Sequence, residues 1–315
     1  MCGIAGIIHR NKTGNVGAEM TGMLQAMKHR GPDSTGFAFY GVPTEGELLL
    51  RFKVAENEDL DSGFEIHEAI KQRRAQVDER IESMGGEIQV AEAPTEYAFL
   101  YRLRFDPKLD SLVRLADYIE DVEGAEVLSI GNALELVKDL GDATDVSSRY
   151  EMGEFVGTHA IGHTRMATES DVDICSAHPY WAYPVSDVSV VHNGQLTNYW
   201  SKRRELERTG HRFLSDCDSE LIAVYVAELT QRGKSLEEAM HQSVDDLDGV
   251  FSYLVATSDE LGLAKDTMAA KPMVLYEGND CIVMASEEVA IRTVFQEEID
   301  TFDPYAGDVR VWSTN

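Results

Sequence analysis

Four short apolar runs separated by turn residues fill residues 249–287 and restrict the fold more than any other feature of the sequence. The runs read GVFSYLVATS, ELGLAKD, PMVLYE and CIVMASE. Runs of this length between turn signals are typical of β-strands that pair in antiparallel order. The segment therefore predicts an antiparallel meander. A further short apolar strand is expected at residues 2–8, at the start of the chain.

Strand-like and helical segments alternate through the rest of the sequence. Helices are expected at residues 16–28, 201–210 and 236–247, and the segment 213–229 begins as a loop and continues as a helix. Strands are expected at FAFYG (37–41) and ELLLRFKV (47–54). Such a mixture predicts an α+β fold in which layers of helices flank packed sheets.

Residues 55–150 differ in character from the segments on either side. Helical spacing at 64–84 and 111–122 alternates with strand-like runs at 96–105 and 125–131, and NALELVKDL (132–140) is interpreted as another helix. This alternation predicts a small α/β lobe inserted into the main domain.

Charge and cysteine usage limit the environments and partners of the chain. The net charge is −28 over 315 residues, and phosphate backbones repel such a surface, so a nucleic-acid partner is not expected. A strongly solvated surface is the preferred interpretation over a docking face for basic subunits. No run of about eighteen apolar residues suggests a membrane span. Four scattered cysteines without metal-site spacing suit a reducing cytoplasm.

Cys2 is the first candidate for chemistry. If Met1 is trimmed, Cys2 carries both a thiol and a free α-amino group, and such an amine titrates near pH ~8. The amine can then act as general base for the thiol of its own residue. A small buried residue in a first strand is the alternative interpretation.

Three further segments offer polar groups for an amide substrate. HNG at 192–194 supplies the Asn193 amide and the Gly194 N–H as donors to an oxyanion, or else forms a hairpin turn. Arg165 presents a fork of donors suited to a carboxylate, and Asp218 is an acceptor for an ammonium group. On its own, either residue is more often a member of a surface ion pair or a helix cap.

The histidines of the same region are not interpreted as metal ligands. His159 and His163 are four residues apart on an expected strand, and no third ligand follows at metal spacing. His178 and His192 are expected to be ordinary hydrogen-bonded histidines. No resident metal or cofactor is predicted for this chain.

Six motifs follow one another in the order MCGIAGI, HRGPDSTG, GHTRMAT, AHP, VHNG and DCDSE. In this order they resemble the class II glutamine amidotransferases, which are N-terminal nucleophile hydrolases. The resemblance covers residues 1–41 and about 156–290. It implies a four-layer α/β/β/α sandwich of two antiparallel sheets over residues 1–315, with the lobe at 55–150 inserted. It also implies hydrolysis of L-glutamine to glutamate and ammonia.

The resemblance assigns the catalytic roles residue by residue. Cys2, after removal of Met1, matches the nucleophile that forms a thioester with glutamine. Asn193 and Gly194 match the oxyanion hole. Arg30 matches an arginine that supports the surroundings of the nucleophile, and His178 is a motif position with a structural role.

The substrate contacts follow from the same resemblance. Arg165 matches the arginine that holds the α-carboxylate of glutamine, and Thr168 lies on the same loop. Asp218 matches the aspartate that receives the α-amino group. Met166 departs from the tryptophan or phenylalanine found in many members, and it is most similar to amidotransferase subunits related to glutamate synthase and N-methylglutamate synthase.

The resemblance also implies partners. Few residues follow the amidotransferase pattern, so the ammonia acceptor is expected on another polypeptide in a cytoplasmic hetero-oligomer. Any FMN or iron–sulfur clusters would belong to those synthase subunits. Two alternatives stay open: a scaffold or regulatory subunit with suppressed activity, and an N-terminal nucleophile hydrolase of a different amide.

Overall fold

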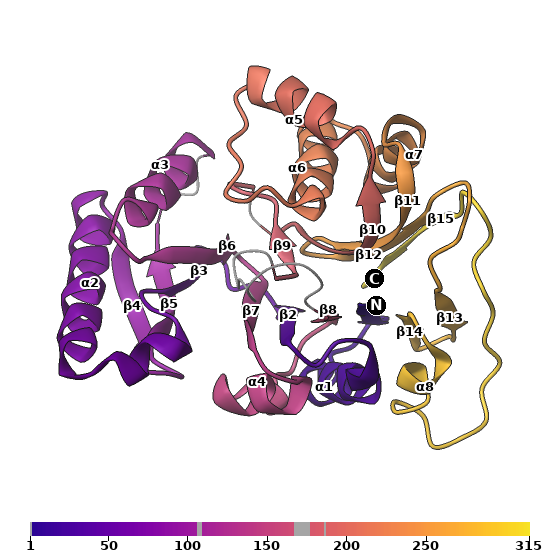
Figure 1. Ribbon diagram of the computed structural model, residues 1–315, viewed down its shortest axis with the longest axis horizontal. Coiled ribbons are helices and arrows are strands. Elements are labelled where there is room, and N and C mark those ends of the chain that lie inside the picture. The colour runs from indigo at the N-terminus through magenta and orange to yellow at the C-terminus, as the bar shows by residue number, and fades with distance from the viewer. Residues whose placement is uncertain (1, 106–108, 167–176, 186) are drawn as a thin grey trace.

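The structure, a computed structural model, describes residues 2–105, 109–166, 177–185 and 187–315. Within these residues the strands form three antiparallel sheets of six, five and four strands. The two larger sheets pack against each other in the core, and the smallest sheet belongs to a lobe beside that core (Figure 1).

The six-stranded sheet carries the start of the chain. In spatial order its strands are β13 (Val274–Glu277), β14 (Cys281–Ala285), β1 (Gly3–His9), β8 (His159–Arg165), β2 (Ser34–Tyr40) and β7 (Leu134–Leu140). All seven residues of β1 are buried, because the strand pairs on both edges and is covered on both faces. An uninterrupted apolar run is the pattern expected of such a strand, and the strand predicted at 2–8 is confirmed.

The five-stranded sheet lies over the first one. In spatial order its strands are β15 (Val309–Ser313), β12 (Glu260–Lys265), β11 (Gly249–Ala256), β10 (Ser189–Leu196) and β9 (Tyr180–Trp181). Strands β10 and β11 contact β1 and β8 across the interface between the sheets. The Tyr40 hydroxyl of β2 crosses this interface to Ser189 Oγ at 2.8 Å, so the two sheets are joined by a buried polar contact as well as by apolar packing.

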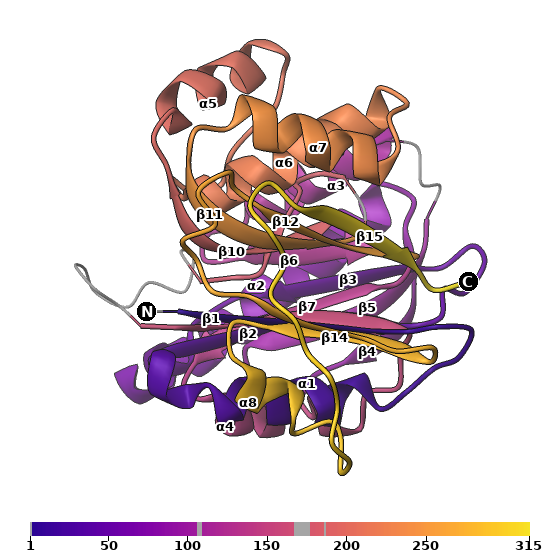
Figure 2. The same cartoon turned by 90° about the vertical axis from the view of Figure 1, so that its right-hand side faces the viewer.

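Helices close both outer faces of this pair of sheets (Figure 2). The helices on the six-stranded side are α1 (Val16–Ala26), α4 (Ala143–Arg149) and α8 (Glu288–Ile291). Those on the five-stranded side are α5 (Tyr199–Arg208), α6 (Asp218–Gln231) and α7 (Leu236–Asp246). The predicted α/β/β/α sandwich is confirmed.

The predicted meander at 249–287 is wrong at its centre. Strands β11 and β12 form one hairpin in the five-stranded sheet, whereas β13 and β14 form another in the six-stranded sheet. The chain changes sheets between Lys265 and Val274. Strand β12 uses its free edge for β15 instead, and that pairing partner lies too far along the sequence for local spacing to indicate it.

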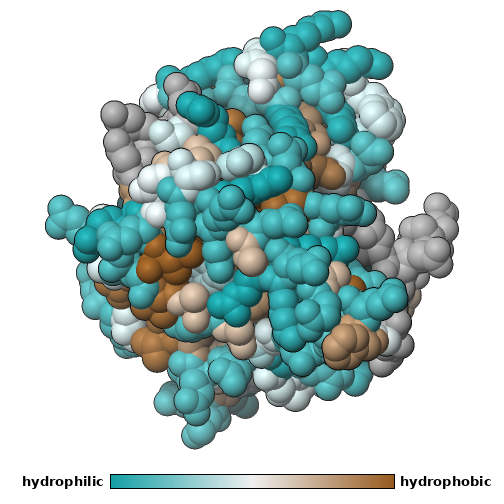
Figure 3. Space-filling view, turned by 90° about the vertical axis from the view of Figure 1, so that its left-hand side faces the viewer, coloured by the Kyte–Doolittle hydropathy of each residue, from teal (hydrophilic) through white to brown (hydrophobic). Residues whose placement is uncertain are grey.

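The lobe combines the four-stranded sheet with two helices. Its strands in spatial order are β4 (Glu87–Glu92), β5 (Ala98–Arg104), β3 (Leu48–Lys53) and β6 (Glu126–Gly131). Its helices are α2 (Phe64–Ser83) and α3 (Leu109–Glu120), and they contact each other and the sheet. The face of the molecule that carries the lobe is mostly hydrophilic (Figure 3).

The helix predicted at 132–140 is wrong, because this segment forms strand β7 at the edge of the six-stranded sheet. Its charged residues are buried and paired by residues distant in sequence. Glu135 binds Arg51 at 2.6 Å, and Lys138 binds Glu126 at 3.1 Å. Buried charges are tolerated when they are paired in this way, and single-sequence spacing does not show those partners.

That residues 55–150 form one inserted unit remains a proposal. Strand pairing places β3, which precedes residue 55, in the four-stranded sheet, and places β7 and helix α4 with the core. Among the described residues, every helix is too short or too polar to span a lipid bilayer.

Candidate active site

A pocket of about 650 Å³ opens where β1, β8 and β10 meet the start of α6. Most of the residues proposed from the sequence line it. These are Cys2, Arg165, His178, Asn193, Gly194 and Asp218. Thr168 lies outside the described residues, and Arg30 lies behind Cys2 rather than on the pocket wall. The fold therefore gathers groups that are up to 216 positions apart in the chain, between Cys2 and Asp218.

Cys2 lies directly before β1 and is held through its backbone. Its carbonyl oxygen accepts hydrogen bonds from Arg30 Nε at 2.9 Å and from Asn193 Nδ2 at 3.2 Å. Arg30 is 8% exposed, and its Nη1 lies 2.5 Å from Glu287 Oε1. Arg30 is thus placed to support the residue proposed as nucleophile, and the Cys2 side chain borders the pocket.

Asn193 and Gly194 lie within strand β10, so the hairpin-turn interpretation of HNG is wrong. They pair with Ser252 and Phe251 of β11. Gly194 has a φ of 151°, and a Cβ at this position would lie 2.2 Å from Val250 O. Only glycine fits this backbone, because other residues rarely adopt such a φ and would also collide with the neighbouring strand.

Asp218 is the first residue of α6, but its carboxylate does not cap that helix. Oδ2 accepts the Leu196 N–H at 2.8 Å, and Oδ1 lies 3.6 Å from His192 Nδ1. Burial raises the pKa of this carboxyl, but hydrogen bonding and the charge of His192 outweigh burial, and the pKa is lowered overall. An ionised carboxylate therefore borders the pocket.

Three histidines and one serine form a buried group next to this carboxylate. The Ser219 hydroxyl lies 2.6 Å from His178 Nε2 and 2.8 Å from His192 Nδ1, and His163 stacks on His178 at 4.0 Å. A hydroxyl has one proton to donate, so at least one of these two imidazoles donates to Ser219. Both histidines were expected to be hydrogen-bonded, and this is confirmed.

Burial keeps part of this group uncharged. It lowers the pKa of His163 to about 3 and the pKa of His178 well below the ordinary value. At neutral pH these two imidazoles therefore add no positive charge beside Asp218. Among the residues that the structure describes, no three His, Cys, Asp or Glu side chains are arranged to hold a metal ion.

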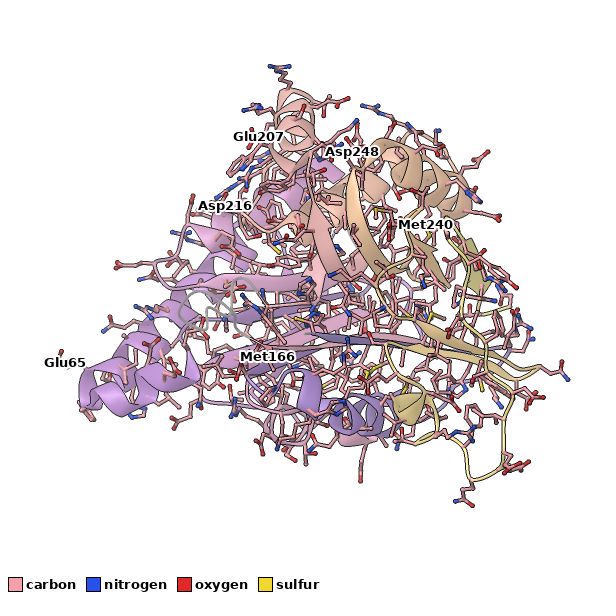
Figure 4. All side chains as sticks on the ribbon, turned by 45° about the vertical axis from the view of Figure 1, so that its right-hand side comes forward. Glu65, Met166, Glu207, Asp216, Met240 and Asp248 are labelled. Atoms are coloured by element: carbon pink, nitrogen blue, oxygen red, sulfur yellow. The ribbon has the colours of Figure 1, made fainter. Side chains whose placement is uncertain are left out.

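Sequence reasoning missed Ser219, Ser286 and Glu287 as members of this region. Ser219 directly follows Asp218 in DCDSE, and the other two belong to MASE at 284–287. For Ser219 the available signal was its place inside the DCDSE motif, and for Ser286 and Glu287 it was their place at the end of the strand-like run CIVMASE. Figure 4 shows Met166, the departure from the family pattern, beside the six-stranded sheet and Asp216 beside α5.

A second cavity of about 320 Å³ lies between the lobe and the core. It is bordered by Glu120 and Glu126 from the lobe and by Lys138 and Arg212 from the core. Burial, the largest influence, helps to raise the pKa of Glu120 to about 7. Of the proposed catalytic and substrate-binding residues that the structure describes, none borders this cavity.

A protein of Methanothermobacter thermautotrophicus named "Putative glutamine amidotransferase" is 42% identical over 320 residues, which is 99% of this chain and 99% of that protein. This chain belongs to the glutamine amidotransferases. The profile of a family described as "Glutamine amidotransferase domain" matches residues 163–293 of the amidotransferase. The glutamine amidotransferase-like protein GlxB of Rhizobium meliloti is 33% identical over 99% of this chain and 98% of its own length.

Solved structures agree with the layers of this amidotransferase. The glutamine phosphoribosylpyrophosphate amidotransferase of B. subtilis has a TM-score of 0.60 at 17% identity. The match covers 99% of this chain and 47% of that one, so the present chain spans about half of that protein. At this identity the likeness shows the fold, and it confirms the N-terminal nucleophile hydrolase fold expected from the sequence.

Proposed function

We propose that this chain is a glutaminase subunit that hydrolyses L-glutamine to glutamate and ammonia through a thioester on Cys2. The observation that carries the proposal is the shared pocket, which brings Cys2, Asn193 and Gly194 together with Arg165 and Asp218. This set contains a nucleophile, two oxyanion donors and one group for each charged end of a free amino acid.

The reaction starts at Cys2 after Met1 is removed. The free α-amino group accepts the thiol proton, and the sulfur attacks the side-chain amide carbon of glutamine. The developing oxyanion accepts hydrogen bonds from Asn193 Nδ2 and the Gly194 N–H. The ammonium group formed by the first step returns its proton to the leaving nitrogen, and ammonia departs. Water then hydrolyses the thioester and releases glutamate.

Glutamine is held at both charged ends. Arg165 ends strand β8 and offers its guanidinium to the α-carboxylate, whereas the Asp218 carboxylate receives the α-ammonium group. Two fixed charges on the pocket wall orient the substrate so that the amide end reaches Cys2. Thr168, three positions after Arg165 in the sequence, is proposed as a further contact.

Ammonia is proposed to pass to a separate synthase polypeptide of the glutamate synthase or N-methylglutamate synthase type. One support is Met166, which stands where many family members have tryptophan or phenylalanine and is most similar to the synthase-related subunits. Another is the amidotransferase-like protein GlxB, which aligns with this chain over 98% of its own length. FMN and iron–sulfur clusters, if the complex uses them, are proposed to lie on that partner.

The test is a Cys2→Ala substitution assayed with and without the partner. Glutamine-dependent product formation should vanish in the variant, while synthesis from added ammonium salt by the partner should survive. Cys281→Ala is the matched control, because Cys281 lies at the outer end of β14, where it pairs with His9 rather than with the start of β1. Glutamate release by the Cys2→Ala variant would refute the proposal.

A further inference from the structure

Ser286 and Glu287, which directly follow strand β14, contact the two groups that surround the Cys2 carbonyl. Ser286 is 2% exposed. Neither residue borders the pocket, so neither touches the substrate in the proposed reaction. Any effect they have on catalysis has to act through Asn193, Arg30 or the backbone of residue 2.

Ser286 is fixed to β1 by two hydrogen bonds. Its backbone N–H donates to Ile4 O at 2.9 Å, and its hydroxyl oxygen accepts the Ile4 N–H at 3.0 Å. The hydroxyl oxygen therefore has a defined position relative to the first strand. It also accepts a hydrogen bond from Asn193 Nδ2 at 3.1 Å, which links β1 and β14 to strand β10 of the other sheet.

The orientation of the Asn193 amide follows from these contacts. Its nitrogen carries two hydrogens, of which one points to Ser286 Oγ and the other to the Cys2 carbonyl oxygen at 3.2 Å. A flipped amide would place Oδ1 against the Cys2 carbonyl, which has no hydrogen to offer. The nitrogen therefore faces residue 2, and the hydrogen not held by Ser286, which donates to the Cys2 carbonyl oxygen in this structure, is the one that turns to the oxyanion in the proposed reaction.

Glu287 acts on the same carbonyl from the other side. Its Oε1 binds Arg30 Nη1 at 2.5 Å, and Arg30 Nε donates to Cys2 O at 2.9 Å. Oε2 lies 3.0 Å from His29 Nε2. One carboxylate thus fixes the guanidinium that fixes the backbone of Cys2.

We propose that Ser286 and Glu287 are positioning residues for glutamine hydrolysis: Ser286 aims the Asn193 amide at the attacked carbonyl, and Glu287 holds Cys2 in place through Arg30. The proposal rests on the glutaminase function proposed above. Since Arg165 and Asp218 bind the charged ends of glutamine, loss of Ser286 lowers kcat and leaves KM nearly unchanged.

A double-mutant cycle separates positioning from ordinary structural support. Ser286→Ala should lower kcat roughly tenfold, less than the roughly 10²–10³-fold loss expected when Asn193→Ala removes an oxyanion donor. In the Asn193→Ala background, the added Ser286→Ala change should lower kcat less than about twofold, because no amide is left to orient. An equal loss of kcat in both backgrounds overturns the proposal.

The Glu287 arm uses its neighbour as the control. Glu287→Ala should lower kcat roughly tenfold. Glu287→Gln should recover most of that loss, because the side-chain carbonyl introduced at position 287 still accepts a hydrogen bond from Arg30. Glu288 has the same charge but pairs at 2.6 Å with Arg292, the residue that follows helix α8. Glu288→Ala should keep wild-type kcat, and a loss equal to that of Glu287→Ala contradicts the assignment.

A crystal structure of the Ser286→Ala protein tests the same point without turnover. The Asn193 nitrogen should leave its position beside the Cys2 carbonyl, and an amide that stays in place overturns the proposal. A wild-type chain that releases no glutamate would refute the proposed function instead, and the crystallographic result would still decide whether Ser286 orients Asn193.

Discussion

Asp218→Asn is the substitution that most directly tests how this pocket recognises a free amino acid. The change keeps the size of the side chain, and the asparagine carbonyl can still accept the Leu196 N–H that now donates to Oδ2 at 2.8 Å. The amide nitrogen then replaces Oδ1 beside the pocket. A charged acceptor for the substrate ammonium group becomes a neutral donor, while the fold around it is retained.

The expected size of the effect follows from one lost contact. The Asp218 side chain is 20% exposed, and a hydrogen bond between charged groups in such a setting is worth about 1.5–3 kcal/mol. Because 1.4 kcal/mol corresponds to a factor of ten in affinity, the dissociation constant for glutamine should rise roughly 10- to 150-fold. The pKa of Asp218 lies below the ordinary value, so the wild-type carboxylate stays ionised and this penalty should be constant between about pH 5.5 and 8.

Two measurements check this reasoning. Calorimetric titration of glutamine into Cys2→Ala and Cys2→Ala/Asp218→Asn gives the dissociation constant without turnover, and steady-state glutamate release gives KM and kcat. Asp245→Asn is the control, because Asp245 is an exposed residue of α7 away from the pocket. A rise in the dissociation constant of less than threefold, or the same rise in the control, would refute the role of Asp218.

Three predictions concern stability. The folded-state pKa of Glu120 is raised to about 7, so its stabilising proton is lost as the pH rises from 4.5 to 7 and the unfolding free energy falls by at most about 3 kcal/mol. Glu120→Gln should remove this fall. Urea unfolding at pH 5 and 8 measures it, and a variant with the wild-type difference in unfolding free energy between the two pH values would contradict it. Gly36→Ala should destabilise the chain by about 3 kcal/mol or more, since its Cβ would lie 2.0 Å from His178 O; an unshifted thermal midpoint would be inconsistent with that packing. Arg51→Met should lower the unfolding free energy by about 3–5 kcal/mol, because it leaves Glu135 buried without its cation. Arg51→Met/Glu135→Leu should recover most of this loss in the same urea assay. Equal losses in the single and double variants would argue against a buried pair.

The sequence pattern was sufficient to predict an element where the apolar residues that explain its burial lie within the element itself. The apolar run of β1 and the apolar spacing of α1 both indicated the elements that form. The helix predicted at 132–140 was wrong, because the local pattern does not show that Glu135 and Lys138 are buried against Arg51 and Glu126 of the lobe. The pairing of β12 with β15 was equally invisible, because the partner strand lies more than forty residues further along the chain.

The site was predictable to the extent that its residues sit in motifs. Cys2, Asn193 and Asp218 each belong to a short signature, and the structure places them around one pocket. The supporting contacts were not predictable in this way. Ser286 contacts Asn193 across 93 positions of sequence. The residue type of Asp218 alone favoured an ion pair or a helix cap, and only its contact with Leu196 shows that the carboxylate is held elsewhere.

The two chain ends differ in how much alteration they tolerate. The Cys2 carbonyl is bonded to Arg30 and Asn193 at the edge of the pocket, whereas Asn315 is exposed beyond β15. An affinity tag fused ahead of Cys2 would acylate the amine on which the proposed chemistry depends and would crowd the pocket. A purification handle belongs after Asn315, and an amino-terminally tagged preparation would be expected to look inert for reasons unrelated to the native protein.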